Sequence, residues 1–301
     1  MPAAEPSPLQ RYLSVQVPVD REMAAILRDA ADEAEKRILA LAGKDGIGAQ
    51  VRRAQLQVVQ RELRKTQAEL WGSVTKATKR GMERAAVAAA EGEQKINDVL
   101  FNAVGVRIPA FEEAMVEQAK HTVENLYARA SNGIPLAESV YKSSQLAGGY
   151  VDRAVNRGIA LGLSARELAQ SVRSLIRPDV PGGVSYASMR LARTEINNAF
   201  HTAQIENRKN EPWTKGMKWN LSGSHPKPDE CNEYAEETHL RNGEAGVFNA
   251  DSVPAKPHPQ CLCFLTTVVV DEDEFIDNFL KGDYNSYIDE RIYSHLPNPV
   301  C

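Results

Sequence analysis

The feature that most constrains this chain is the spacing of its apolar residues before about residue 210. One stripe is Ala24, Leu27, Ala31, Ala34, Ile38 and Leu41, and a second is Leu56, Val59, Leu63, Leu70, Val74 and Ala77. Steps of three and four residues are the period of an amphipathic α-helix that buries one face. The stripes therefore predict helices over residues 20–42 and about 50–99, the second packing against another helix of this chain or of a partner.

Further helices are expected downstream, because the same periodicity continues between helix-breaking residues. Pro109 opens a helix that ends near Asn132-Gly133, and two shorter helices are expected near residues 136–148 and 150–161. Ser164 and Glu167 have the spacing of a capping box, which predicts the start of a helix that reaches Ile176. Another helix is expected over about 184–209.

After Pro212 the helical period is replaced by β-branched runs, which predict strands at residues 216–221 and 263–270. A last helix is expected near 275–280. The sequence thus indicates an α+β fold, in which a long-helix N-terminal region precedes a mixed α/β module with a small antiparallel sheet and a loop-rich insert. We expect four segments: an extended arm (1–19), a helical region (20–135), the module (136–270), and a C-terminal helix and tail (271–301).

Composition narrows the class of protein. The chain has 301 residues, of which 43% are hydrophobic and 25% charged, as in folded globular proteins. No apolar run approaches the roughly 20 residues that cross a bilayer, and the N-terminus lacks an apolar signal segment, so we expect a cytoplasmic product without a membrane contact. Motifs of the types GxGxxG, P-loop, GxSxG and HExxH are absent from the sequence, which favours a protein that is not an enzyme.

The sharpest local motif is a group of metal-ligand residues. It consists of Cys231, His258, Cys261 and Cys263. Thiolates and imidazoles are the ligands of tetrahedral zinc, and four protein ligands make a closed, structural site. Two other interpretations stay open, namely a disulfide and simple packing of small buried side chains. His225 and His239 lie nearby in the sequence and either could replace a missing ligand.

Basic residues dominate residues 51–84, although the whole chain has a net charge of -4. The cations are Arg52, Arg53, Arg61, Arg64, Lys65, Lys76, Lys79, Arg80 and Arg84. Only three Glu accompany them, so this segment could contact DNA phosphates or an acidic partner. The other interpretation is a solvated helix face, since Trp71 alone is a poor platform for stacking bases.

A polar run lies in the expected helix 184–209. Glu195 and Asn198 are three residues apart and share a face, next to Arg193. A catalytic role would require a nucleophile or a paired carboxylate nearby, and none is evident in the sequence. An ion pair or a polar clasp to the following strand is the favoured interpretation.

Four separate motifs together resemble one protein family. They are the helical run 191–200 (Leu-Ala-Arg-Thr-Glu-Ile-Asn-Asn-Ala-Phe), the tryptophan strand 218–220, the Asp-Glu-Cys turn 229–231 and the ending 257–263 (Pro-His-Pro-Gln-Cys-Leu-Cys). In this order and spacing they resemble the Mu F-like head-morphogenesis proteins of tailed bacteriophages, as does the stretch 158–168. The resemblance covers about residues 150–270. The family often has a second Cys three residues after the first, where this chain has Tyr234.

The resemblance implies a structural minor capsid protein that acts in head assembly and influences the packaging or delivery of DNA. It implies the phage portal protein as partner, with the major capsid or scaffold protein as further partners. The expected location is the virion, inside or at the portal vertex of the head, after assembly in the host cytoplasm. One alternative is a DNA-binding internal head protein. Another is an ADP-ribosyltransferase-like enzyme, because modules similar to this one occur joined to such domains, and Glu195 would then be the catalytic candidate.

Overall fold

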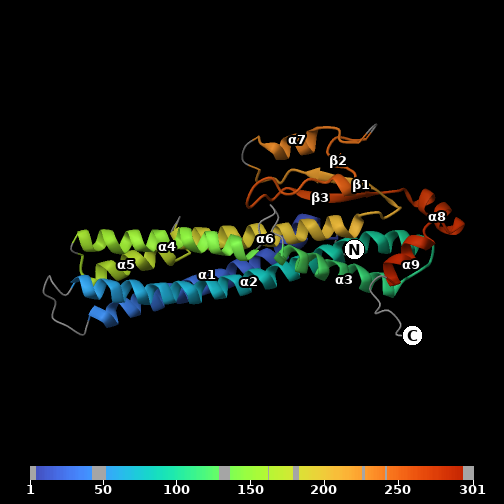
Figure 1. Cartoon of the computed structure of the whole chain (residues 1–301). Coiled ribbons are helices and arrows are strands. Elements are labelled where there is room, and N and C mark those ends of the chain that lie inside the picture. The colour runs from blue at the N-terminus through green and yellow to red at the C-terminus, as the bar shows by residue number, and fades with distance from the viewer. Residues whose placement is uncertain are drawn as a thin grey trace, which may run out of the picture. The chain divides into compact units, whose positions relative to one another are not determined.

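The computed structural model describes residues 5–42, 52–128, 136–161, 163–178, 183–225, 228–240 and 243–293. The chain is mostly helical, at 74%, and carries one small three-stranded antiparallel sheet, which confirms the α+β class. Six helices precede the sheet (Figure 1): α1 (Pro8–Ala42), α2 (Arg52–Ala103), α3 (Pro109–Ala128), α4 (Leu136–Ala160), α5 (Ala165–Ile176) and α6 (Gly183–Arg208).

The expected extended arm over residues 1–19 is wrong from Pro8 onward, because α1 begins there. The Ser7 amide donates to Gln10 Oε1 at 2.8 Å and the Gln10 amide donates to Ser7 Oγ at 3.2 Å. This is a capping box, with Pro8 in the first helical position that proline favours. Pro18 stands inside the helix at a typical cost of about 3 kcal/mol, and the burial of Tyr12 and Val19 on either side offsets it. Residues 1–4 lie outside the described part.

Two expectations for shorter elements are also wrong. Residues 136–160 form the single helix α4, because Ala147, Val151 and Val155 continue one buried face past Gly148-Gly149. The helix near 275–280 is not the last one, because α8 (Glu272–Lys281) is followed by α9 (Asn285–Tyr293), whose Ile288 is buried. The capping box at Ser164 is confirmed, with Ser164 N donating to Glu167 Oε2 at 2.7 Å.

The described strands begin only after residue 212, as predicted. They are β1 (Thr214–Asn220), β2 (Val247–Phe248) and β3 (Phe264–Val269), in the order β2-β1-β3 with both neighbours antiparallel to β1. Trp219 of β1 pairs with Leu265 of β3. Between β1 and β3 lie α7 (Glu230–Glu236) and the short 3-10 helix η1 (Ala250–Ser252).

The chain divides into two compact units. Unit 1 comprises residues 1–16, 81–133 and 194–301, and unit 2 comprises residues 17–80 and 134–193. The division at about residue 135 that the sequence suggested stays a prediction. Because α1, α2 and α6 each contribute residues to both units, neither unit is a continuous stretch of chain.

Unit 2 consists of packed helices, and most residues of the predicted apolar stripes are buried between them. Leu63, Leu70, Val74 and Ala77 of α2 are buried, while Val59 is half-buried and the side chain of Leu56 lies outside the described part. An ion pair between Arg37 of α1 and Glu69 of α2, at 3.1 Å, links two of the helices. Of the two partners expected for the α2 stripe, the structure therefore provides helices of the same chain.

An aromatic cluster forms one core of unit 1. Trp213 lies at its centre, with ring centroids 5.2–6.0 Å from Phe101, Phe111, Phe275 and Tyr284. Most of these rings meet edge to face, an arrangement that aromatic pairs favour. The cluster joins α2, α3 and the start of β1 to α8 and the residues that follow it.

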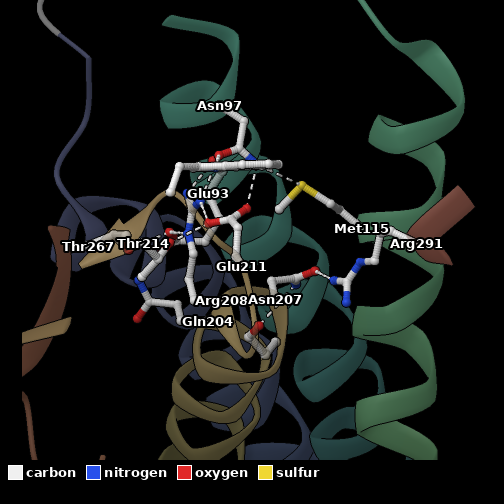
Figure 2. Close-up of polar contacts among 12 residues, drawn as sticks. Glu93, Asn97, Met115, Gln204, Asn207, Arg208, Glu211, Thr214, Thr267 and Arg291 are labelled. Atoms are coloured by element: carbon white, nitrogen blue, oxygen red, sulfur yellow. Dashed lines mark hydrogen bonds and ion pairs between the residues drawn. The ribbon is translucent and has the colours of Figure 1, made fainter. Parts of the chain in front are cut away.

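A buried ionic network lies beside this cluster (Figure 2). The guanidinium of Arg208, on α6, donates from Nε to Glu93 Oε2 at 2.7 Å and from Nη1 to Asn97 Oδ1 at 2.7 Å and to Glu211. Thr267 of β3 donates to Glu93 at 2.6 Å. The side chain of Arg208 has no exposed surface and that of Glu93 has 3%. The network therefore ties α2, α6 and the sheet through charges that are almost fully buried.

Both carboxylates of the network accept several hydrogen bonds. Glu93 also accepts from Gln204 at 2.9 Å, and Glu211 also accepts from Asn97 Nδ2 at 3.1 Å. The two carboxylates raise the pKa of Arg208 against the opposing effect of its burial, so the guanidinium stays charged. A buried ion pair that is fully hydrogen-bonded is tolerated, whereas removal of one partner leaves an uncompensated charge.

We predict that Arg208→Met lowers the free energy of unfolding by about 3–5 kcal/mol, because Glu93 and Glu211 lose their cation inside the core. Chemical denaturation of the full chain measures the change. Arg107→Ala is the matched control, since Arg107 forms an exposed ion pair with Glu112 and should change stability little. Equal effects of the two substitutions would contradict the role assigned to the network.

Candidate metal centre

The first ligand arm of the candidate metal centre lies at the start of α7. Asp229 is the N-cap residue of this helix, and its Oδ1 accepts from the Cys231 amide at 2.8 Å. The Asp229 amide in turn donates to Asn232 Oδ1 at 3.2 Å, which completes a capping box. Cys231 is thereby fixed in the first helical turn, with no exposed surface.

The second arm is the loop that leads into β3. Gln260 adopts a φ of 60°, in the left-handed region, and so forms a sharp turn between His258 and Cys261. The side-chain amide of Asn197, on α6, donates to the carbonyl of Cys261, and the ammonium of Lys256 donates to the carbonyl of Cys263. These two bonds hold the backbone of both cysteines.

The structure brings the predicted ligands together in two overlapping groups. Cys231 Sγ lies 3.5 Å from Cys261 Sγ and 3.6 Å from His258 Nε2. Cys231 and Cys263 form the other group with His225, in which all ligand atoms lie within 4.8 Å of one another. The edges of a tetrahedral zinc site with thiolate and imidazole ligands are roughly 3.5–3.8 Å long. These side chains are therefore spaced as metal ligands are, and the described groups could hold a metal ion.

Two histidines compete for the imidazole position. His225 Nδ1 lies 3.7 Å from Cys263 Sγ, and its Nε2 lies 2.9 Å from Asn232 Oδ1. His258 Nε2 lies 3.1 Å from Asp229 Oδ2. A ligand histidine usually has its second ring nitrogen fixed by a polar group, an arrangement that His225 has in full. Sequence reasoning offered His225 only as a substitute and did not identify Asp229.

His239, the other substitute, does not join the centre. Its ring stacks on that of Phe248 with centroids 3.7 Å apart, and its Nε2 lies 3.0 Å from the carbonyl oxygen of Tyr234. Tyr234, which stands where the family often has a second cysteine, packs against Trp219 with ring centroids 5.1 Å apart. Both positions therefore contribute to packing around the centre.

The charges around the thiols favour a thiolate at one position. The hydrogen bond from Cys261 lowers the pKa of Cys263 to about 5, while burial raises the pKa of Cys231 to about 12. Lys256 is buried beside them, with its ammonium 5.2 Å from the centroid of the Trp219 ring, and burial lowers its pKa. A metal ion deprotonates the thiols that bind it. Three thiolates with one divalent ion carry a net charge of minus one, which the Lys256 ammonium would balance.

The disulfide interpretation is not realised, because Cys231, Cys261 and Cys263 are all free thiols. Cys301, the fourth cysteine of the sequence, lies outside the described part of the chain.

The polar run on α6 serves several different contacts. Arg193 forms an ion pair with Asp20 at 3.0 Å, both within unit 2. Asn197 binds the Cys261 carbonyl, and His201 Nε2 lies 2.9 Å from the Pro254 carbonyl oxygen. Burial lowers the pKa of His201 to about 3, so this ring is neutral. Asn197 and His201 therefore clasp the loop before β3 that carries His258, Cys261 and Cys263, called the metal loop below.

Most cations predicted as a DNA contact are solvent-exposed. Those with described side chains are Arg61, Arg64, Lys65, Lys76, Lys79, Arg80 and Arg84, and all are exposed. Lys65 pairs with Glu62 at 2.8 Å and Arg80 pairs with Glu22. The side chains of Arg52 and Arg53 lie outside the described part.

No protein-family model matches this chain, and neither a curated protein nor a solved structure matches it. Among the described residues, no helix combines the length and the apolar character needed to cross a membrane.

We predict that Glu195 lowers the stability of the folded chain in a pH-dependent manner. This residue is 5% exposed, and its burial raises its pKa to about 7. Between the ordinary pKa of 4.5 and about 7, the folded chain retains a proton that the unfolded chain releases. Stability should therefore fall as the pH rises through this window, and Glu195→Gln should remove a penalty of up to about 3 kcal/mol above it. Urea denaturation across this pH range measures the difference.

The exposed Glu91→Gln is the matched control for this experiment and should follow the unsubstituted chain at every pH. If Glu195→Gln follows it too, the carboxylate of Glu195 is not desolvated as described.

Proposed function

We propose that this chain is a structural minor capsid protein of a tailed bacteriophage, of the Mu F-like head-morphogenesis type, and that it acts without catalysis. The observation that carries the proposal is that the motifs of the resemblance contact one another. Asn197 of the helix motif binds Cys261 of the Cys/His ending, and Cys231 of the turn motif lies 3.5 Å from Cys261 between their sulfur atoms. Trp219 of the strand motif belongs to the same buried cluster as these cysteines. Motifs that were collected from the sequence by their order alone thus form one packed module.

Zinc is the metal that suits this centre best. The described donors are three thiols and two imidazoles, which are the ligands of structural zinc. The centre joins α7 to the loop before β3, and both lie in the insert between β1 and β3. Because metal binding contributes folding free energy directly, zinc would fix this insert against the sheet.

We predict one zinc per chain, measured by elemental analysis of protein purified without chelator. Cys231→Ser should abolish zinc binding, since Cys231 is the donor that both groups of ligand residues share. His225→Ala and His258→Ala should each retain zinc with lower affinity, because the other imidazole can occupy the fourth position, whereas the double variant should lose it. Zinc should also raise the melting temperature of the unsubstituted chain.

Cys301→Ser is the matched control for the cysteine substitution and should retain a full equivalent of zinc. A zinc-free wild-type chain, or full zinc occupancy in Cys231→Ser, would contradict a zinc centre at these residues.

The proposed partner is the portal protein, with the major capsid or scaffold protein as further contacts, and the proposed location is the portal vertex of the head after assembly in the host cytoplasm. Support comes from the resemblance and from the helical unit 2. The α2 stripe is buried within that unit, so the partner must bind outward-facing residues. A gene for a portal protein next to the gene for this chain would strengthen the proposal.

We predict that the chain enters heads only when the portal is present. Heads assembled from the matching capsid and scaffold proteins, with and without portal protein, are purified and their content of this chain is measured. The expected result is a few copies per portal-containing head and a loss of most of the signal in heads without portal. Equal incorporation into both kinds of head would contradict portal binding.

A second candidate function is a DNA-binding internal head protein, which the exposed cations of α2 favour. Binding through these cations would weaken steeply with salt, because each neutralised phosphate releases counterions. This candidate is compatible with the same location in the head.

A further inference from the structure

An open groove of about 790 Å³ lies between α4 and α5, entirely within unit 2. Its α4 wall carries Tyr150, Arg153 and Arg157, and its α5 wall carries Ser171 and Ser174. Arg153 and Arg157 are four residues apart on one helix, so their guanidinium groups project from the same face. The groove therefore combines two cations with two hydroxyl groups.

The two arginines have no carboxylate partner among the described residues. Arg153 lies against its own helix instead, with its guanidinium carbon 4.8 Å from the centroid of the Tyr150 ring. This cation–π contact holds the side chain at the groove without neutralising its charge. Both residues are solvent-exposed, so their charges are available to a ligand.

The nearby carboxylates form other ion pairs or hydrogen bonds, or project from a different face of α4. Asp32 and Glu35 of α1 both bind Arg173, at 2.6 Å and 3.0 Å. Glu167 accepts from the Ser164 amide in the capping box. Asp152 precedes Arg153 directly, and successive residues of a helix project about 100° apart. No carboxylate lines the groove.

The hydroxyl groups add hydrogen-bonding capacity. Ser171 makes no hydrogen bond within the described part of the chain, so its hydroxyl can donate to a ligand. Ser174 donates to the Gln170 carbonyl at 2.9 Å and can rotate toward the groove. Two guanidinium forks with a hydroxyl donor match the oxygens of a phosphate group, which arginine binds in a bidentate manner.

The charge of unit 2 favours the same ligand. Its residues include 21 Lys and Arg against 13 Asp and Glu, a net charge of +8, although the whole chain has a net charge of -4. A local field of this sign attracts anions to the groove.

We propose that the α4–α5 groove is a phosphate-binding site, which takes either a phosphodiester of a nucleic-acid backbone or free phosphate. This proposal goes beyond the structural role above and does not depend on the zinc centre. It also differs from the α2 cations, because it places the anion at Arg153 and Arg157.

The test compares two paired substitutions in the full chain. The double substitution Arg153→Gln with Arg157→Gln removes both positive charges from the groove. Arg21→Gln with Arg28→Gln removes the same charge from exposed positions of α1, in the same unit and outside the α2 cations, and serves as the matched control. Circular dichroism verifies that both variants fold. Binding of a short mixed-sequence DNA duplex is measured by fluorescence anisotropy across a salt series, and inorganic phosphate is tested by melting temperature against chloride of equal ionic strength.

We expect the groove variant to bind the duplex about tenfold more weakly than the unsubstituted chain, with a salt slope smaller by about two phosphate contacts, while the control variant loses about threefold or less. Loss of the phosphate-induced melting shift, with duplex binding unchanged, would identify free phosphate as the ligand. Equal losses in both variants would overturn the proposal, because binding would then depend on overall charge. So would the absence of any binding of duplex or phosphate to the unsubstituted chain.

Discussion

A buried charge on α6 is the interaction on which unit 1 depends. Arg208 has no access to water, so it is tolerable only if Glu93, Glu211 and Asn97 all reach it. These partners come from α2 and from the turn before β1, and Thr267 of β3 joins through Glu93. Hydrogen bonds to charged groups are directional, whereas apolar packing is not. The network therefore fixes the register between a helix and a sheet that lie far apart in the sequence.

The same face of α6 also positions the candidate metal centre. Asn197, His201, Gln204 and Arg208 follow one another at steps of four, three and four residues, so they form one stripe along the helix. The first two bind carbonyls of the loop that carries the cysteines, and the last two bind Glu93 of α2. This polar stripe of α6 thus joins the loop before β3 to α2. That support holds Cys261 in place, with its Sγ 3.5 Å from that of Cys231.

Residue spacing and residue type predicted several elements correctly, and they failed at the start of α1 and in the middle of α4. The capping box at Ser164 and the strands after residue 212 follow from spacing and residue type, and both are present. The extended arm was wrong because the capping box of Ser7 and Gln10 starts a helix at Pro8 despite the four prolines of residues 1–19. The break expected at Gly148-Gly149 does not occur, since the apolar face of α4 continues past it. Glycine costs a helix only about 1 kcal/mol, which packing readily offsets.

The sequence by itself determined the α+β class and showed which cysteines and histidines were candidates for a metal centre, because hydrophobic period and residue type are local properties. Only the tertiary structure decided which polar residues are buried and which residues they contact. The α6 stripe has the helical spacing of a solvated face, yet it is buried, and His225 and Asp229 reach the centre only because α7 folds over the metal loop. A polar side chain shows its type in the sequence, whereas its partner and its burial depend on which distant segment packs against it.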